Sequence, residues 1–139
     1  MEGAYTFLHV GPACCPSAVR KGIREQLARW GTSELADDAT LIASELLGNA
    51  IRYGTPPVGL TLDLHGAPGD RRRLWIGVTD AGQAFDIDLV QARWRNPSAR
   101  LGTGGRGLRL VDALSRDWGD RPRRSGHTVW AELDCGTRS

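Results

Sequence analysis

Residues 45–54 read Glu45-Leu46-Leu47-Gly48-Asn49-Ala50-Ile51-Arg52-Tyr53-Gly54, and this pattern predicts a largely buried helix that carries polar groups. At about 100° of turn per residue, Glu45 and Asn49 lie one above the other, with Arg52 on the same stripe. The residues beside the stripe are apolar. Polar groups in such a place need partners, and a bound metal ion and a nucleophile would supply them. A core helix whose Glu and Asn bond to neighbouring backbone explains the stretch equally well by itself.

The composition indicates one compact domain over residues 1–139. The chain has 139 residues, 40% of them hydrophobic, which is enough for a core and too short for a second domain. A net charge of +2 is too small to indicate a nucleic-acid partner. No apolar run approaches the roughly 20 residues that span a bilayer, and the N-terminus lacks a basic flank before an apolar core. We therefore expect no membrane association and a cytoplasmic location.

The cysteines and histidines indicate neither disulfides nor a metal centre. Cys14 and Cys15 are adjacent, Cys135 is distant, and this spacing fits no disulfide framework or CxxC motif. We expect all three thiols to be reduced. No histidine stands at ligand spacing from a cysteine or carboxylate, so we expect a structural role for each histidine.

Hydrophobic periodicity predicts a short strand and two helices in the first part of the chain. The strand covers residues 5–10. In the first helix, which begins near Ser17, apolar residues recur at intervals of four, four and three: Val19, Ile23, Leu27 and Trp30. Gly31 ends this helix. The second helix begins within residues 33–36 and ends at Gly54, before two prolines.

The period then changes from helical to alternating. Residues 58–65 and 74–79 alternate between apolar and other side chains, and the turn cluster 66–70 between them predicts a hairpin. Residues 83–104 predict a long loop or lid, with room for a short helix over 87–95. Helical spacing returns after Gly105-Arg106-Gly107 with Leu108, Val111 and Leu114. Two closing strands, 118–119 and 128–133, are expected on either side of a basic loop.

Two further stretches carry groups suited to a nucleotide. Asp80 comes at the end of a predicted strand, where its carboxylate can accept from an exocyclic amine, and Gly82 lets backbone approach a planar ring. Residues 102–107 are rich in glycine and lead into a helix, whose free N–H groups suit phosphates. Alone, each stretch has an ordinary explanation, as an Asp-Gly turn or a flexible loop.

Together, these three stretches in this order resemble the ATP-binding domain shared by histidine kinases, gyrase, MutL and the bacterial anti-sigma-factor serine kinases, known as the GHKL or Bergerat fold. The resemblance covers nearly the whole chain and ends at Gly126-His127-Thr128, which is similar to the family's final Gly-x-Thr. It implies a two-layer α/β sandwich with a mixed, mostly antiparallel sheet on one side and helices on the other. One departure is Ala84, which stands where the family has the second glycine of Asp-x-Gly-x-Gly.

The resemblance also implies a role for each site residue. Asn49 would bind Mg²⁺, and Glu45 would be the general base. Asp80 would accept from the adenine amino group with the help of Thr128, while Gly82 would lie under the base. Gly105 and Gly107 would present N–H groups to the phosphates, and Leu108 is counted among the ATP-binding residues. Arg52 and Arg106 are candidates for contacting phosphate charge, and a plain surface ion pair is at least as good an explanation for either arginine.

The size of the chain and the order of its motifs are most similar to those of the stand-alone anti-sigma kinases. A sensor histidine kinase would need a phosphoacceptor-histidine helix before this domain. The implied function is an anti-sigma factor that uses Mg-ATP to phosphorylate a serine of a STAS-type anti-anti-sigma protein. It would also bind a sigma factor, and a homodimer is compatible with this function. The alternative is a nucleotide-responsive protein-binding regulator that transfers no phosphate; Glu45 favours the kinase and Ala84 the regulator. Direct nucleic-acid binding through the arginines of 71–73 and 121–124 is disfavoured, since no aromatic stacking residues accompany them.

Overall fold

The computed structural model describes residues 3–9, 16–66, 71–82 and 103–135, with backbone alone for residues 3–9, 16 and 103–106. The expected lid, the short helix over 87–95 and Ala84 lie outside the described residues. Cys14 and Cys15 lie outside them as well.

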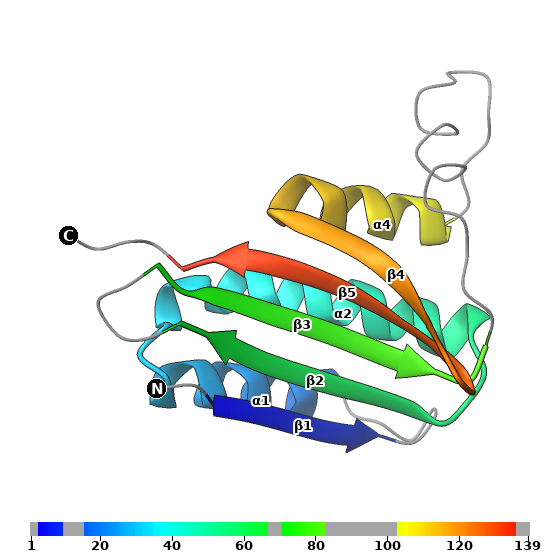
Figure 1. The fold of residues 1–139 in the computed structure, drawn as a ribbon, viewed down its shortest axis with the longest axis horizontal. Coiled ribbons are helices and arrows are strands. Elements are labelled where there is room, and N and C mark those ends of the chain that lie inside the picture. Colours follow the sequence, from blue (N-terminus) through cyan, green and yellow to red (C-terminus); the bar gives the residue numbers. More distant parts are fainter. Residues whose placement is uncertain (1–2, 10–15, 67–70, 83–102, 136–139) are drawn as a thin grey trace.

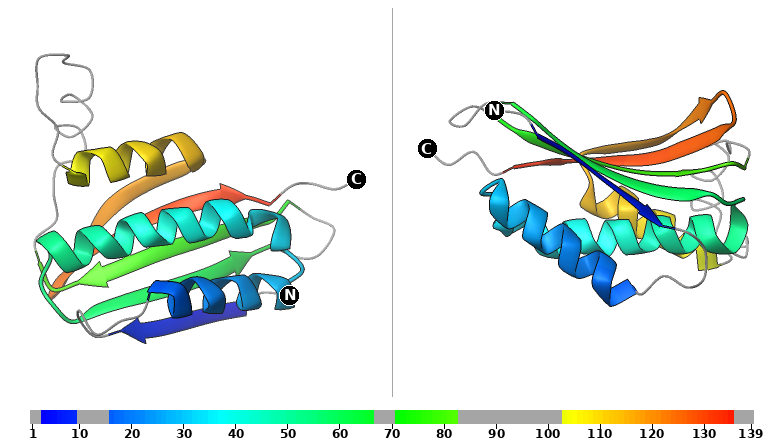
Figure 2. Two further views of the ribbon diagram at one scale, coloured as in Figure 1. Left: turned by 180° about the vertical axis from the view of Figure 1, so that it is seen from behind. Right: turned by 90° about the horizontal axis from the view of Figure 1, so that it is seen from below.

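In the described part of the chain, three α-helices cover one face of a five-stranded sheet (Figure 1). The helices are α1 (Pro16–Arg29), α2 (Ala36–Tyr53) and α4 (Thr103–Leu114). Figure 2 shows all three on the same side of the sheet, and the other side of the sheet carries no helix among the described residues. The predicted two-layer α/β sandwich is confirmed.

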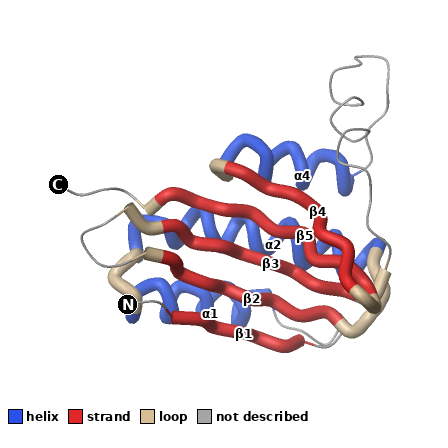
Figure 3. Tube along the Cα trace, viewed as in Figure 1, coloured by secondary structure: helices blue, strands red, loops and turns tan. Residues whose placement is uncertain are grey.

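The sheet has the strand order β1-β2-β3-β5-β4, shown in red in Figure 3. The strands are β1 (Gly3–His9), β2 (Val58–His65), β3 (Arg73–Asp80), β4 (Asp117–Arg123) and β5 (Gly126–Asp134). All four neighbouring pairs are antiparallel, so the described strands show no mixed pairing. The predicted hairpin is confirmed as β2 and β3. The strand β5 lies between β3 and β4, which places the end of β3 beside the start of β5.

The core lies between the sheet and the helices because every second strand residue faces α2. Leu62 pairs with Ile76, and Ile76 pairs with Ala131 on β5. All three are fully buried. From α2, Ala39 and Ile42 complete this layer without exposure. Burial of each large aliphatic side chain contributes about 1.5–3 kcal/mol, and the small alanine lets the helix approach the sheet closely.

The predicted boundaries of the first two helices agree with the structure. At the end of α1, Gly31 has a φ of 72°, and the N–H of Thr32 donates to the carbonyl oxygen of Leu27 at 2.8 Å. Glycine adopts this left-handed conformation without a Cβ clash. The short 3-10 helix η2 (Ser33–Leu35) then leads into α2, whose first turn contains Asp37 and Asp38. Carboxylates there are favoured by the helix dipole.

Two boundaries near the C-terminus differ from the prediction. The helix α4 begins at Thr103, so the glycines at 104, 105 and 107 are part of the helix. The expected basic loop is wrong, because Arg121 and Arg123 lie within β4 and pair with Thr128 and Gly126 of β5. Charged side chains are well tolerated on an edge strand, where they remain solvated and discourage pairing with another sheet.

Cys135 is a free, buried cysteine just after β5, as predicted for this thiol. Burial raises the pKa of the Cys135 thiol, so the side chain stays protonated and poorly nucleophilic. None of the helices in the described part of the chain has the length and apolar character needed to cross a membrane.

Candidate functional site

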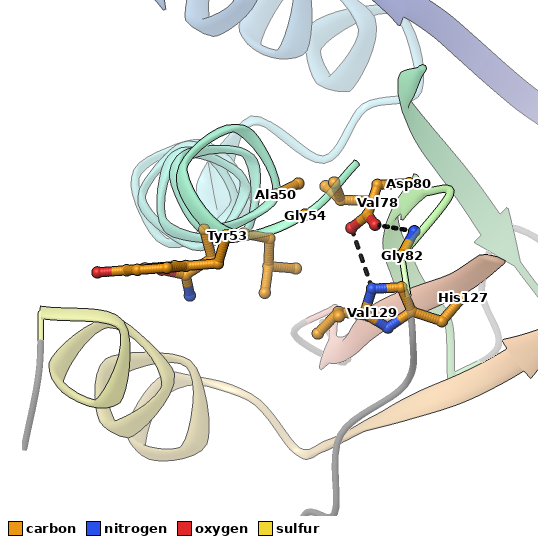
Figure 4. A pocket seen from close by; sticks show the side chains of 10 residues that line it. Ala50, Tyr53, Gly54, Val78, Asp80, Gly82, His127 and Val129 are labelled. Carbon is orange, nitrogen blue, oxygen red and sulfur yellow. Dashed lines mark hydrogen bonds and ion pairs between the residues drawn. The ribbon is translucent and has the colours of Figure 1, made fainter. Parts of the chain in front are cut away.

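A cavity of about 260 Å³ lies between the second half of α2 and the ends of β3 and β5 (Figure 4). Its walls are mostly apolar, and its polar groups come from three elements. The lining residues are Leu46, Asn49, Ala50, Tyr53, Gly54, Val78, Asp80, Gly82, His127 and Val129. A narrow apolar cavity with a few convergent polar groups is typical of a small-molecule site.

One side of the site is formed where α2 meets the start of α4. A Cβ at Gly107 would lie 2.5 Å from Glu45 Oε1 and 3.6 Å from Asn49 Nδ2. Glu45 and Asn49 therefore both point toward α4, as their common stripe on the helix predicted. Gly107 provides the room for the Glu45 carboxylate.

The carboxylate of Asp80 is held at the end of β3 by backbone donors. Asp80 is 3% exposed, and its Oδ1 accepts from Gly82 N at 2.6 Å and from Thr55 N at 3.2 Å. The N–H of Ala81 also donates to the carbonyl oxygen of Thr55 at 2.7 Å, which ties β3 to the segment after α2. A Cβ at Gly54 would lie 2.5 Å from Asp80 Oδ2. Asp80 therefore has one oxygen fixed by backbone and the other close to Gly54, another residue of the cavity wall.

His127 lies beside Asp80, although only a structural role was expected for this histidine. Its Nε2 is 3.0 Å from Asp80 Oδ2, and its Nδ1 is 2.7 Å from Asp120 Oδ1. These partners lie 47 and 7 residues away along the chain, so no local motif brings them together. The alternation of side chains between the two faces of β5 could have identified His127 as buried, because it shares a face with the buried Ala131 and Leu133.

Thr128 is not among the residues that line the cavity, and its expected role beside Asp80 stays a prediction. Successive residues of β5 point to opposite faces of the sheet, so Thr128 faces away when His127 faces Asp80. The Thr128 hydroxyl lies 2.8 Å from Thr79 Oγ1 and accepts from Arg123 Nη1 at 3.0 Å. The residue before it, His127, is the one that contacts Asp80.

The structure describes the surroundings of three of the residues expected at the phosphates. Arg52 is exposed, with Nη2 3.5 Å from Asn49 Oδ1 and its guanidinium 5.6 Å from the centre of the Tyr53 ring. Leu108 is 8% exposed and belongs to the hydrophobic core. Gly107 is the fifth residue of α4, so its N–H is placed to bond within the helix rather than to a ligand.

Gly105 and Arg106 lie in the first turn of α4, where N–H groups lack partners within the helix. The position of Gly105 agrees with the expected phosphate contact through its backbone. The side chain of Arg106 lies outside the described residues.

The residues on α2 fit a hard divalent cation. The described residues contain no cluster of three or more His, Cys, Asp or Glu that could form a metal centre. Mg²⁺ commonly takes one or two protein oxygens and completes its shell with water and phosphate oxygens. Among the described residues, Asn49 Oδ1 has only a long contact with Arg52, so it is suited to that role.

The glycines around Asp80 fit a flat ring. A Cβ at Gly54 or at Gly82 would lie within 2.8 Å of an Asp80 carboxylate oxygen, so both positions need the small residue. The apolar walls supplied by Val78 and Val129 suit the faces of a nucleobase.

Comparisons with known proteins identify the family of the chain. The family model described as the histidine kinase-like ATPase domain matches residues 15–133. A solved structure, the histidine kinase domain from the Erythrobacter litoralis EL346 blue-light activated histidine kinase, is similar with 19% sequence identity and a TM-score of 0.49. That similarity covers 86% of this chain and 59% of the solved chain. A comparison with curated proteins finds no match. Since the family model spans most of the sequence, the chain belongs to the family of histidine kinase-like ATPase domains.

Proposed function

We propose that this ATP-binding domain is a Mg-ATP-dependent serine/threonine kinase that acts as an anti-sigma factor. The observation that best supports phosphoryl transfer is the place of Glu45, whose Oε1 would be 2.5 Å from a Cβ at Gly107. A carboxylate on α2 is thereby next to the start of α4, where free N–H groups and the helix dipole favour phosphate charge. A base and a phosphate site would then be neighbours.

In this proposal, each polar residue of the site contributes either to nucleotide binding or to phosphate transfer. Glu45 accepts the proton of the attacking hydroxyl. Asn49 holds Mg²⁺, which when bound would neutralise phosphate charge. Asp80 accepts a hydrogen bond from the adenine amino group, and Gly105 offers its N–H to the phosphates. Phosphoryl transfer depends mainly on positioning and charge stabilisation, so this small set of groups is sufficient.

The proposed acceptor is a serine of a STAS-type anti-anti-sigma protein, and the proposed second partner is a sigma factor. Both partners come from the resemblance of the sequence to anti-sigma kinases, as does the proposed homodimer. Phosphorylation adds about 1.5 to 2 negative charges to the serine. Such a change at a protein interface would alter partner binding, which is how transfer would regulate the sigma factor.

The test replaces Glu45 with Gln, which keeps the shape of the side chain and removes the proton acceptor. ATP affinity should stay nearly the same, because a general base acts on the attacking hydroxyl. Transfer from labelled ATP to the partner serine should fall by roughly 10²-fold or more, the usual scale for positioned acid–base catalysis. Calorimetry measures the first quantity and phosphate transfer the second. Asn49→Ala should instead weaken Mg-ATP binding, since the ion loses a ligand.

Glu25→Gln is the matched control, because Glu25 is an exposed glutamate on α1, an element that contributes nothing to the cavity. Glu25→Gln should keep both the affinity for ATP and the transfer of phosphate to the partner serine. If wild type and Glu45→Gln transfer phosphate equally, or neither transfers to any candidate partner, the kinase is ruled out. Nucleotide binding without transfer would support the protein-binding regulator instead.

A further inference from the structure

The helix-free face of the sheet carries two tryptophans whose rings lie beside glycines. On β3, a Cβ at Gly77 would overlap the ring of Trp75. On β5, Trp130 pairs with Gly77 and Gly119, and a Cβ at Gly119 would lie 3.0 Å from Trp130 Nε1. Both tryptophans are half-buried, and both alternate with core residues, so they point away from the helices. The two rings therefore fill space that the missing side chains leave on this face.

The same rings line a hollow of about 410 Å³, together with four polar residues. Two of these, Asp63 and His65, contact each other at 3.4 Å. The other two are Arg121 and Glu132. Among the described residues, Arg121 forms no ion pair, and Glu132 has one long contact, with Arg73 Nη1 at 3.9 Å. The hollow thus contains one cation and one anion without a close partner in the described part of the chain.

These two charges stand on opposite sides of the tryptophans. The pairing of β4 with β5 places Arg121 beside Thr128 and Asp117 beside Glu132. Trp130 lies between the two pairs along β5. Four residues separate the pairs, which is about 13 Å at about 3.3 Å per residue. The face therefore has a positive end, an aromatic middle and a negative end.

We propose that two copies of the chain pack through this helix-free face; the inference rests on the homodimer named in the proposed function and gives its surface. A two-fold axis in the plane of the interface, running across the strands at Trp130, brings the two Trp130 rings together. The same rotation places the positive end of each copy on the negative end of the other. Arg121 of one copy then meets Glu132 of the other copy, and this contact occurs twice. A face with one sign of charge at both ends would repel its own copy, so the charge distribution favours this occupant.

The face is also large enough for a stable dimer. Its five strands are seven to nine residues long. At about 4.8 Å between strands and about 3.3 Å per residue, it measures roughly 24 by 23 Å, or about 550 Å² in projection. Two copies would bury roughly 1,100 Å², which exceeds the roughly 1,000 Å² expected of a biological interface. Face-to-face sheets with aligned strands are a common packing arrangement.

Both nucleotide cavities would stay accessible in this dimer. The helices and the cavity lie on the other side of the sheet from Trp75 and Trp130 (Figure 2). Dimer formation therefore requires no change at Asp80 or Asn49. The dissociation constant of the dimer should be the same with and without Mg-ATP.

The experiment measures the dissociation constant of the dimer by sedimentation velocity, at chain concentrations from about 0.1 to about 100 µM. Arg121→Glu sets two like charges against each other at both contacts, so the dissociation constant should rise at least tenfold. Glu132→Lys should have the same effect. Arg20→Glu is the matched control, because Arg20 is an exposed arginine on α1, on the other side of the sheet, and it should keep the wild-type value.

Mixing the two variants tests the two-fold arrangement itself. In a heterodimer of Arg121→Glu with Glu132→Lys, the two introduced charges meet each other and the two native charges meet each other. Both contacts again join opposite signs, so the mixture should form dimers at concentrations where neither variant does so alone. A mixture that stays monomeric would overturn the arrangement.

Trp130→Ala tests the aromatic middle of the face and should raise the dissociation constant at least tenfold, as expected for an aromatic side chain at the centre of an interface. Wild-type affinity in both Trp130→Ala and Arg121→Glu would overturn the inference and leave a homodimer that uses another surface. A wild-type chain that stays monomeric at about 100 µM would end both the inference and the proposed homodimer. The proposed kinase would still stand or fall by phosphate transfer. If Trp130→Ala instead weakens binding of the anti-anti-sigma protein to a monomeric chain, that partner covers the face and the inference is overturned.

Discussion

Gly107 gives the carboxylate of Glu45 the space that it occupies at the start of α4. A Cβ at this position would be 2.5 Å from Glu45 Oε1 and 3.5 Å from its Cδ, so any other residue would displace the proposed base. Gly48, in the middle of α2, has no such neighbour, since the nearest atoms to its Cβ position are the guanidinium nitrogens of Arg52 at 3.6 Å. Both glycines carry the same conformational cost of a glycine within a helix, but of the two only Gly107 would bring a Cβ within 3 Å of another side chain.

Gly107→Ala should separate stability from activity. Alanine is favoured over glycine within a helix by about 0.5–1 kcal/mol, and Glu45 can swing aside because the clash is with the end of a flexible side chain. The free energy of unfolding should stay equal or rise by up to about 1 kcal/mol, while phosphate transfer falls roughly tenfold or more through lost positioning. Gly48→Ala should raise stability by the same amount and keep transfer. Denaturant unfolding and a transfer assay on both variants make the comparison; retained transfer in Gly107→Ala would contradict the role given to Glu45.

The helices and the hairpin could be predicted because their signals are local. Apolar residues at helical spacing, Gly31 and Gly54 at the helix ends, and alternation in β2 and β3 each depend on neighbours in the sequence. The edge strand β4 was predicted too short because its outward arginines hide the alternation. Which of His127 and Thr128 faces Asp80 could not be predicted, since a one-residue difference along a strand reverses the side of the sheet.

The turn into β5 is the junction with the least room. Gly126 has a φ of 154°, and a Cβ there would overlap the carbonyl oxygen of Asp80 and lie 2.8 Å from Ala81 Cα. Gly126→Ala should therefore lower the free energy of unfolding by roughly 2–4 kcal/mol, because rigid backbone must move. Gly31→Ala is the control: its φ is 72°, but nothing lies within 4 Å of its Cβ position, so the loss should be about 1 kcal/mol. Equal losses in the two variants by denaturant unfolding would show that the β3–β5 junction is not closely packed.

The site as a whole depends on contacts that the sequence could not predict. Thr55, Asp80 and His127 are linked by hydrogen bonds across 25 and 47 residues, through a strand order that places β5 between β3 and β4. The sequence indicated Glu45, Asn49, Asp80 and Gly82 because each belongs to a local motif. His127 stands only at the unspecified middle position of Gly126-His127-Thr128 and Asp120 belongs to no motif, so only the assembled sheet brings them to Asp80. The cavity therefore forms with the fold, and a ligand that fills it should stabilise the whole domain.

Nucleotide binding should raise the thermal stability of the domain through Asp80. A ligand that binds only the folded state at 100 times its dissociation constant stabilises by about 2.7 kcal/mol, which for a domain of this size is a rise in Tm on the order of 10 °C. Asp80→Asn should lower the starting Tm, because the amide has one oxygen in place of the two with which Asp80 accepts from Gly82 N and Thr55 N and contacts His127 Nε2. It should also lose most of the rise in Tm with Mg-ATP.

Glu45→Gln should keep the rise in Tm with Mg-ATP, since the proposed base contributes to phosphate transfer rather than to ATP affinity. Asp63→Asn changes a carboxylate on the helix-free face of the sheet, outside the cavity, and should keep it too. Thermal unfolding with and without Mg-ATP measures all four proteins. A rise in Asp80→Asn as large as in wild type would mean that the nucleotide binds somewhere other than this cavity, because a ligand held by Asp80 cannot stabilise equally a protein that has lost the acceptor.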